Sequence, residues 1–305
     1  MRSKRLIVAA IVLVVIGAVG AFAYRLYLNP ARDTAIDLVP SDAVVYGSLF
    51  LSPSTHQKQA LGALLKHFPQ ASTPELAKSE LERLLDGALA SNGIDFTHDV
   101  EPWIGRQVAF FIETGGSDPP ADALLIATRD PDAANTSLAK AADAMSGPEP
   151  SHLSYRGIDY ISTSESAAGV VGNFAVVASS SQEFENVVTA HDGMSLGDRK
   201  VFQEAIAPLP HDRVGTLYFD TSRIASLSTG AAGSASPPPA PSLFESLPPI
   251  AVGAFLRSDS IVFDVAIQRS GSPSNPSLPK LLGDLPSNTW AALEIPSLGQ
   301  GVARG

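Results

Sequence analysis

Ser137 and Lys140 have the spacing of a catalytic pair. In Ser137-Leu138-Ala139-Lys140 the two side chains are three residues apart, so on a helix they share one face, as in the penicillin-recognising enzymes. The same spacing recurs at Ser277 and Lys280. The Lys-Thr-Gly element of those enzymes is absent, and a serine-rich chain produces such spacings by chance. The sequence therefore assigns no catalytic residue.

Oxygen ligands for a cation are gathered at Asp95, Asp99 and Glu101, although they fit no known calcium-loop pattern. We expect these side chains to act in turns or helix caps instead. The histidines form no chelating pair at helical spacing, and we expect them on the surface; they are at positions 56, 67, 98, 152, 191 and 211. No metal ligand and no cofactor-binding residue is predicted.

Trp103, in the segment Asp99-Val100-Glu101-Pro102-Trp103-Ile104-Gly105, has two interpretations. An exposed indole could form an aromatic binding platform. Because Val100 and Ile104 flank it at the start of a strand, we favour a buried anchor of the core.

Hydrophobic periodicity and turn residues predict the elements that must position these side chains. On the second predicted helix, Leu81, Leu84, Leu85 and Ala88 line one face, which should lie on a sheet. Hairpin turns are predicted at Tyr155-Arg156-Gly157-Ile158 and Val171-Gly172-Asn173-Phe174. The predicted helices are Thr55–His67, Pro74–Ala90, Ala133–Met145 after Asp130, Ser180–Thr189 and Asp198–Ala207, and the other predicted strands are Ala43–Leu51, Arg106–Glu113, Ala123–Thr128, Arg213–Asp220, two within Ile250–Gln268, and Thr289–Ile295.

A short lead-in motif recurs before three predicted strands. Val39-Pro40-Ser41-Asp42, Leu209-Pro210-His211-Asp212 and Leu285-Pro286-Ser287-Asn288 each precede a β-rich run. After the first two, a hairpin follows further along the chain. This recurrence indicates an internal duplication, with equivalent strands in two superposable sheets. The alternative is that proline followed by a small polar residue is simply a common start of a strand.

The N-terminus carries a predicted membrane anchor. Leu6 to Ala23 contain no charge, and at about 1.5 Å per residue they cover ~27 Å of a ~30 Å hydrocarbon layer. Three cations precede the segment, so the N-terminus should stay inside and the rest should lie outside. Ala21-Phe22-Ala23 would alternatively suit cleavage of a secretory signal. Both interpretations place the bulk of the chain outside the cytoplasm.

Composition limits the partners of the exported part. The first 25 residues hold four of the 21 Lys and Arg and no acid, which leaves 17 basic against 31 acidic residues, a net charge of −14. Nucleic acid is therefore disfavoured as a partner. The absence of cysteine excludes disulfides and thiol chemistry. We divide the chain into the anchor at 1–25, a main domain at 26–227, an Ala/Gly/Ser/Pro-rich linker at 228–249, and a hairpin with the start of a further, incomplete unit at 250–305.

These features resemble DUF3352, a family of bacterial membrane-anchored proteins known as a domain of unknown function. The resemblance rests on the anchor, the lead-in motifs, Gly93-Ile94-Asp95-Phe96, the Pro-Trp-x-Gly segment at 102–105 and the hairpin at 155–157. It implies a bacterial envelope protein, brings no assigned activity, and implies that related chains are longer than this one.

The sequence as a whole predicts an α+β fold of antiparallel sheets with helices packed on one face, preceded by one N-terminal transmembrane helix. We expect a non-catalytic binding or interaction domain in the cell envelope, with the membrane, envelope proteins or lipid as partners. The alternatives are a carrier or sensor of an apolar ligand, or a hydrolase with an unrecognised site.

Overall fold

The computed structural model describes residues 33–68, 73–89, 94–113, 121–144, 149–224 and 248–267, all within one compact unit, residues 1–268. The helices and helical turns are η2 (Ala35–Leu38), α2 (Thr55–Leu65), α3 (Pro74–Leu89), η5 (Phe96–Val100), α4 (Pro131–Ala144), α5 (Ser181–Asp192), η6 (Leu196–Asp198) and α6 (Lys200–Ile206). The strands are β1 (Ala43–Phe50), β2 (Ile104–Glu113), β3 (Asp122–Thr128), β4 (Ser151–Tyr155), β5 (Ile158–Ser162), β6 (Ala167–Val171), β7 (Phe174–Ala178), β8 (Gly215–Phe219), β9 (Ile250–Leu256) and β10 (Ile261–Ile267). Each element predicted within the described ranges is confirmed in type.

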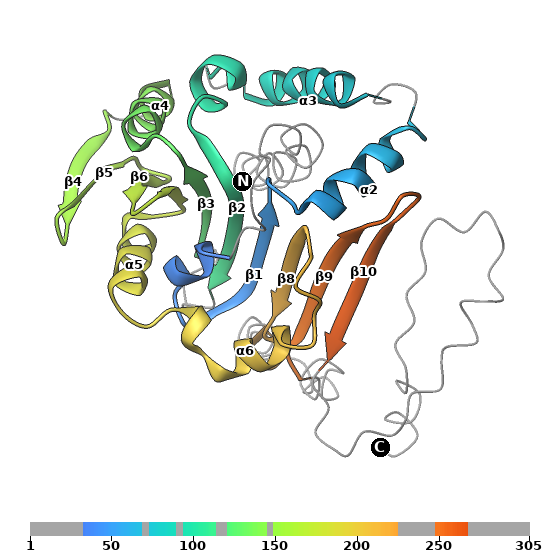
Figure 1. Cartoon of the computed structure of the whole chain (residues 1–305). Helices are drawn as coiled ribbons and strands as arrows, with labels where there is room; N and C mark the ends of the chain where they lie inside the picture. Colours follow the sequence, from blue (N-terminus) through green and yellow to red (C-terminus); the bar gives the residue numbers. More distant parts are fainter. Residues whose placement is uncertain are drawn as a thin grey trace, which may run out of the picture. The chain divides into compact units, whose positions relative to one another are not determined.

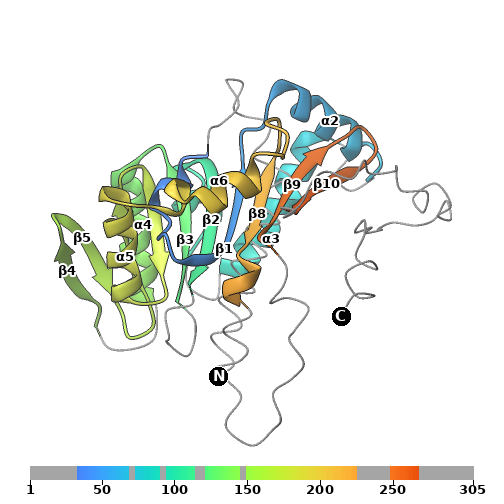
Figure 2. The ribbon, with the colours of Figure 1, turned by 90° about the horizontal axis from the view of Figure 1, so that it is seen from below.

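All ten strands form one antiparallel sheet in the order β10-β9-β8-β1-β2-β3-β7-β6-β5-β4. β1 and β8 lie side by side near its middle, with β2 and β3 on one side and β9 and β10 on the other (Figure 1). Figure 2 shows the strands following one another across the molecule. The expectation of two superposable sheets is therefore wrong, because β1 and β8, the strands that follow the first two lead-in motifs, pair with each other in one sheet.

The pairing of β1 with β8 nevertheless matches the recurrence in the sequence. Gly47 pairs with Leu217 at the centre of the β1–β8 register. Gly47 and Leu217 are as far apart in the sequence as Pro40 and Pro210, the prolines of the first two lead-in motifs. A twofold axis through this pair would therefore superpose β1, with its hairpin β2–β3, on β8, with its hairpin β9–β10. We call this relation the local twofold.

Helices cover both faces of the sheet, so the prediction of helices on one face is wrong. On one face, Phe184 and Val187 of α5 and Phe202 of α6 share a core with the sheet residues Tyr46 and Leu125. The opposite face packs against α4, α3 and η5 in one cluster and against α2 in another. The reason lies in strands such as β7, where Phe174–Ala178 is an unbroken apolar run with both faces to bury.

The apolar face predicted for α3 is only partly buried. Leu85 is buried in the core that contains Trp103, whereas the neighbouring Leu84 is exposed. Leu84 therefore does not lie on the sheet as predicted. The structure describes nothing of the side chains of Leu81 and Ala88.

Several predictions concern residues outside the described ranges. They are the membrane segment Leu6–Ala23, the linker at 228–249 apart from its last two residues, the pair Ser277 and Lys280, and the strand Thr289–Ile295. Among the described helices, none has the length and apolar composition needed to span a bilayer. The hairpin β9–β10, which follows the predicted linker, pairs with β8 and extends the same sheet.

Candidate functional site

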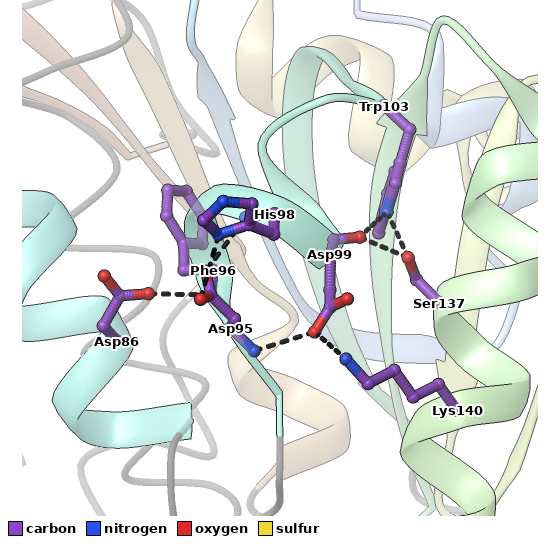
Figure 3. Close-up of polar contacts among 8 residues, drawn as sticks. All are labelled: Asp86, Asp95, Phe96, His98, Asp99, Trp103, Ser137 and Lys140. Atoms are coloured by element: carbon purple, nitrogen blue, oxygen red, sulfur yellow. Dashed lines mark hydrogen bonds and ion pairs between the residues drawn. The ribbon is translucent and has the colours of Figure 1, made fainter.

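The aspartates of the segment 94–105 act as caps, as predicted. Asp95 begins η5, where its Oδ1 accepts from the backbone N–H of His98 at 2.9 Å and its Oδ2 lies 3.0 Å from His98 Nδ1 (Figure 3). The backbone N–H of Asp95 in turn donates to Asp99 Oδ2 at 2.9 Å. The hydrogen bonds from His98 lower the pKa of Asp95, because they stabilise its charged form.

Asp99 links η5 to helix α4 through both residues of the candidate catalytic pair. Lys140 Nζ donates to Asp99 Oδ2 at 2.5 Å, and the Ser137 hydroxyl donates to the Asp99 backbone carbonyl (Figure 3). The hydrogen bond from Lys140, followed by that from the Asp95 backbone, lowers the pKa of Asp99. Because Ser137 donates to a carbonyl oxygen rather than to a base, this arrangement fixes position and does not activate a nucleophile.

Trp103 is a buried anchor, as we expected, and completes this set of contacts. Its side chain is 2% exposed, and its indole N–H donates to the Asp99 carbonyl at 2.7 Å and to Ser137 Oγ at 3.0 Å. We call Asp95, Asp99, Trp103, Ser137 and Lys140 the aspartate clasp. The clasp joins η5, the start of β2 and α4 on one face of the sheet.

The Pro-Trp-x-Gly segment has a steric reason for its glycine. A Cβ at Gly105 would lie 2.9 Å from both the carbonyl carbon and the carbonyl oxygen of Ala127 in the neighbouring strand β3. Arg129, which directly follows β3, also holds the segment, since its Nε donates to the Pro102 carbonyl at 2.8 Å. Only glycine permits so close an approach of the two backbones.

A family model with the description "Protein of unknown function (DUF3352)" matches residues 6–303, which includes all three lead-in motifs and the whole clasp. The chain belongs to the DUF3352 family. The family resemblance inferred from the sequence is thereby confirmed.

Comparison with curated proteins gives no match for this DUF3352 chain. Among solved structures, three crystal forms of TP0453 are similar at 12% sequence identity, with TM-scores of 0.37 to 0.39. These alignments cover 80–81% of the DUF3352 chain and 82% of TP0453. At this level of similarity no property of TP0453 is transferred.

The histidines of the DUF3352 chain are dispersed. His98 contacts Asp95, and His56 Nδ1 lies 3.4 Å from Asp212, which belongs to the second lead-in motif. Within the described ranges, no three His, Asp or Glu side chains come close enough together to hold a metal ion.

Two glutamates that the sequence reasoning missed meet in the core. Glu113, the last residue of β2, and Glu183, in the first turn of α5, are 2% and 1% exposed. Glu183 lies three residues after Ser180, whose hydroxyl accepts from the Glu183 backbone N–H at 3.1 Å. In the sequence, a glutamate three residues after a serine is typical of a capping box. Glu183 therefore looks like a capping residue at the surface, and the burial of its side chain cannot be predicted.

An apolar strip is exposed on strand β10. Ile261, Phe263 and Val265 alternate along the strand and are 52%, 61% and 40% exposed. In the sequence, Ile261–Ile267 is an apolar run interrupted only by Asp264, so it does not indicate which side of the hairpin is left uncovered. We call these three residues the β10 strip.

The local twofold shows what the β10 strip lacks. Leu124 on β3 is in register with Gly47, two strands away across the sheet. Val265 on β10 is in register with Leu217, two strands away in the opposite direction. Leu124 is 7% exposed, because it packs in a cluster with Leu138 of α4, and beyond β3 the sheet continues to β7. No described element covers Val265 or pairs with the outer edge of β10.

Proposed function

We propose that this chain is a membrane-anchored protein of the bacterial envelope whose folded part lies outside the cytoplasm and binds another protein through β10. The anchor is supported by the uncharged segment Leu6–Ala23 and the cations that precede it. A binding role rather than catalysis is supported by the use of Ser137, Lys140 and Asp99 in the clasp.

The observation that carries the proposal is the β10 strip at a sheet edge. A strand edge offers backbone N–H and C=O groups to an incoming strand, and alternate apolar side chains provide specificity. Exposed strands of this kind are a liability unless a partner covers them. Phe263 is the natural centre of such an interface, because large aromatic side chains contribute most of the binding free energy.

The charge on β10 indicates the chemistry of the partner. Asp264 lies on the face opposite the β10 strip, beside Gly253 of β9, which has no side chain to oppose it. No ion pair engages Asp264 within the described part of the chain. The partner we propose is an extended protein segment with apolar residues at alternate positions and a lysine or arginine that faces Asp264.

A photocrosslinking amino acid at position 263 of the full chain in intact cells tests this interface. The control carries the same amino acid at Leu153, an exposed apolar residue on β4, at the other end of the sheet. We expect one protein adduct at 263 and none at 153, with the crosslink in an alternating apolar segment.

The crosslinked segment, made as a synthetic peptide, should bind the purified protein, and Phe263→Asp should weaken binding by about 30-fold or more, as for a central aromatic contact. Leu153→Asp should leave the affinity unchanged. Adducts with lipid, with a second copy of the chain, or equal in amount at both positions would overturn the proposed partner.

The location is tested separately with protease added outside spheroplasts. The protein should fractionate with membranes, and digestion should remove everything beyond about Tyr24. Full-length protein in the soluble cytosol, protected from protease, would refute the location without bearing on the β10 interface.

A further inference from the structure

Glu113 and Glu183 place two carboxyl groups together in the core between the sheet and α5. One oxygen of each, Oε1, is buried without a hydrogen-bond partner. Glu183 Oε2 accepts from Asn186 Nδ2 at 3.3 Å. Two ionised carboxylates in such a place would repel each other and would also lack the solvation that a buried charge requires.

The charged groups that face this pair are mostly acidic. Asp42 approaches from the segment before β1, Asp122 from the start of β3, and Arg223 from the segment after β8. Arg223 favours the ionised form of Glu113, whereas Asp42 disfavours it. Ser179, which directly follows β7, contributes only a hydroxyl. This hydroxyl accepts a hydrogen bond from the Asp122 backbone N–H at 3.0 Å. One cation among these carboxylates does not balance the pair.

Burial is the main reason that the pair retains a proton. Burial, followed by the charge of Glu183, raises the pKa of Glu113 to about 8. Burial likewise raises the pKa of Glu183 to about 7, although the hydrogen bond from Glu113 favours its ionised form. Below about pH 7 both carboxyl groups are therefore protonated, and between about pH 7 and pH 8 the pair holds one proton, which we assign to Glu113 as donor to the Glu183 carboxylate.

We propose that Glu113 and Glu183 form a proton-operated latch that holds the first turn of α5 against the ends of β2 and β3. The latch is closed when the pair holds at least one proton. Loss of the last proton leaves two buried negative charges, which are relieved when the first turn of α5 moves into solvent. Phe184 and Val187 of α5 would then leave the core that they fill over the sheet.

The sign of the pH dependence follows from the raised pKa values. An exposed glutamate has a pKa near 4.5, so the closed state binds more protons than the open state between about pH 4.5 and pH 8. Opening therefore releases two protons between about pH 4.5 and pH 7 and one proton between about pH 7 and pH 8, and a higher pH favours opening. The stabilising contribution of the pair is full below pH 4.5 and is lost as the pH rises through 7 to 8.

Hydrogen exchange of the full chain between pH 5 and pH 8 tests the latch. After correction for the chemical exchange rate, the opening constant of α5 amides such as Phe184 and Val187 should rise by at least about tenfold per pH unit. Amides of α4, on the opposite face, should show no such rise. An equal rise in α4 and α5 would mean global unfolding and would overturn the latch.

Glu113→Gln is the decisive variant, because glutamine has the same shape, has no charge and can still donate to Glu183. It should lower the pH dependence in α5 by about one proton, that is by about tenfold per pH unit, and keep α5 closed at pH 8. Glu165→Gln, which removes one exposed carboxylate from the β5–β6 turn, should keep the wild-type slope. If Glu113→Gln fails to fold, Glu183→Gln serves in its place. A wild-type slope in the folded variant would overturn the proposal.

Discussion

Gly47 of β1 and Leu217 of β8 are paired at the point where the two halves of the sheet meet. A Cβ on Gly47 would lie 2.2 Å from Cε1 of Phe110 and 2.9 Å from Cδ2 of Leu217. The absence of a side chain at Gly47 therefore lets the side chains of both neighbouring strands close over β1. The local twofold therefore passes through a position of β1 where a side chain would obstruct this packing.

Gly47→Ala should consequently destabilise the protein, by about 1–3 kcal/mol as for other overpacked sites. The matched control is Gly62→Ala, in the middle of α2, where an added Cβ meets nothing within 4 Å. Since alanine is the better helix former, this control should raise stability by about 0.5–1 kcal/mol. Chemical denaturation of the two variants distinguishes them, and equal effects would show that Gly47 is not sterically constrained.

Trp103→Ala should cost about 3–5 kcal/mol, because it removes a large buried side chain from the clasp. Ser137→Ala, which removes one hydrogen-bond partner of the indole and leaves the ring in place, should cost only about 1 kcal/mol. Thermal unfolding measures both. A midpoint unchanged by Trp103→Ala would contradict the assignment of Trp103 to the core.

The parts of the fold that the sequence predicts are those set by neighbouring residues. At the β4–β5 turn, Arg156 and Gly157 have φ values of 49° and 80°, the left-handed conformation that a two-residue hairpin turn needs. Asp130 Oδ1 accepts from the Ala133 backbone N–H at 3.0 Å and so caps α4. Such signals are complete within four or five residues, so they can be recognised without tertiary structure.

The parts that sequence reasoning missed depend on contacts between distant segments. The pairing of β1 with β8 joins the strands that follow the first two lead-in motifs, and nothing in either motif indicates that the two strands are partners. Glu113 and Glu183 each look like an ordinary polar residue at the end of an element, and only the packing of α5 on the sheet buries them together. Leu84 is exposed although its neighbour Leu85 is buried, because successive residues of a helix point in different directions.

The free energy of unfolding at low pH should depend on the Asp99–Lys140 contact. The pKa of Asp99 is lowered in the folded protein, so its stabilising contribution is present above the unfolded value of 3.8 and is lost as the pH falls below it. Lys140→Gln should therefore reduce the loss of stability between pH 5 and pH 3. Lys200→Gln breaks an exposed ion pair with Glu204 on α6 and should have little effect on the loss of stability between pH 5 and pH 3. Identical curves for the two variants would argue against a role for Asp99.

The first described residues are held to the sheet by a polar network around Gln107 and Asp33. Gln107 is 2% exposed; its Oε1 accepts from the backbone N–H groups of Thr34 and Ala35 at 3.1 and 3.3 Å, and its Nε2 donates to Asp33 Oδ1 at 2.6 Å. Asp33 Oδ1 also accepts from the buried Tyr46 hydroxyl at 2.7 Å. This network fixes the point at which the chain that follows the proposed anchor joins the folded domain.

Gln107→Leu keeps the approximate volume of the side chain and removes its hydrogen bonds, so Asp33 and two backbone N–H groups lose a partner. We expect a loss of at least about 2 kcal/mol, because buried polar groups are left unsatisfied. Gln203→Leu, which removes a single bond from an exposed amide to the Gly197 carbonyl, should cost less than about 1 kcal/mol. The second measurement is limited proteolysis near η2, which should become faster in Gln107→Leu alone. Unchanged cleavage together with unchanged stability would show that the network does not hold this segment to the sheet.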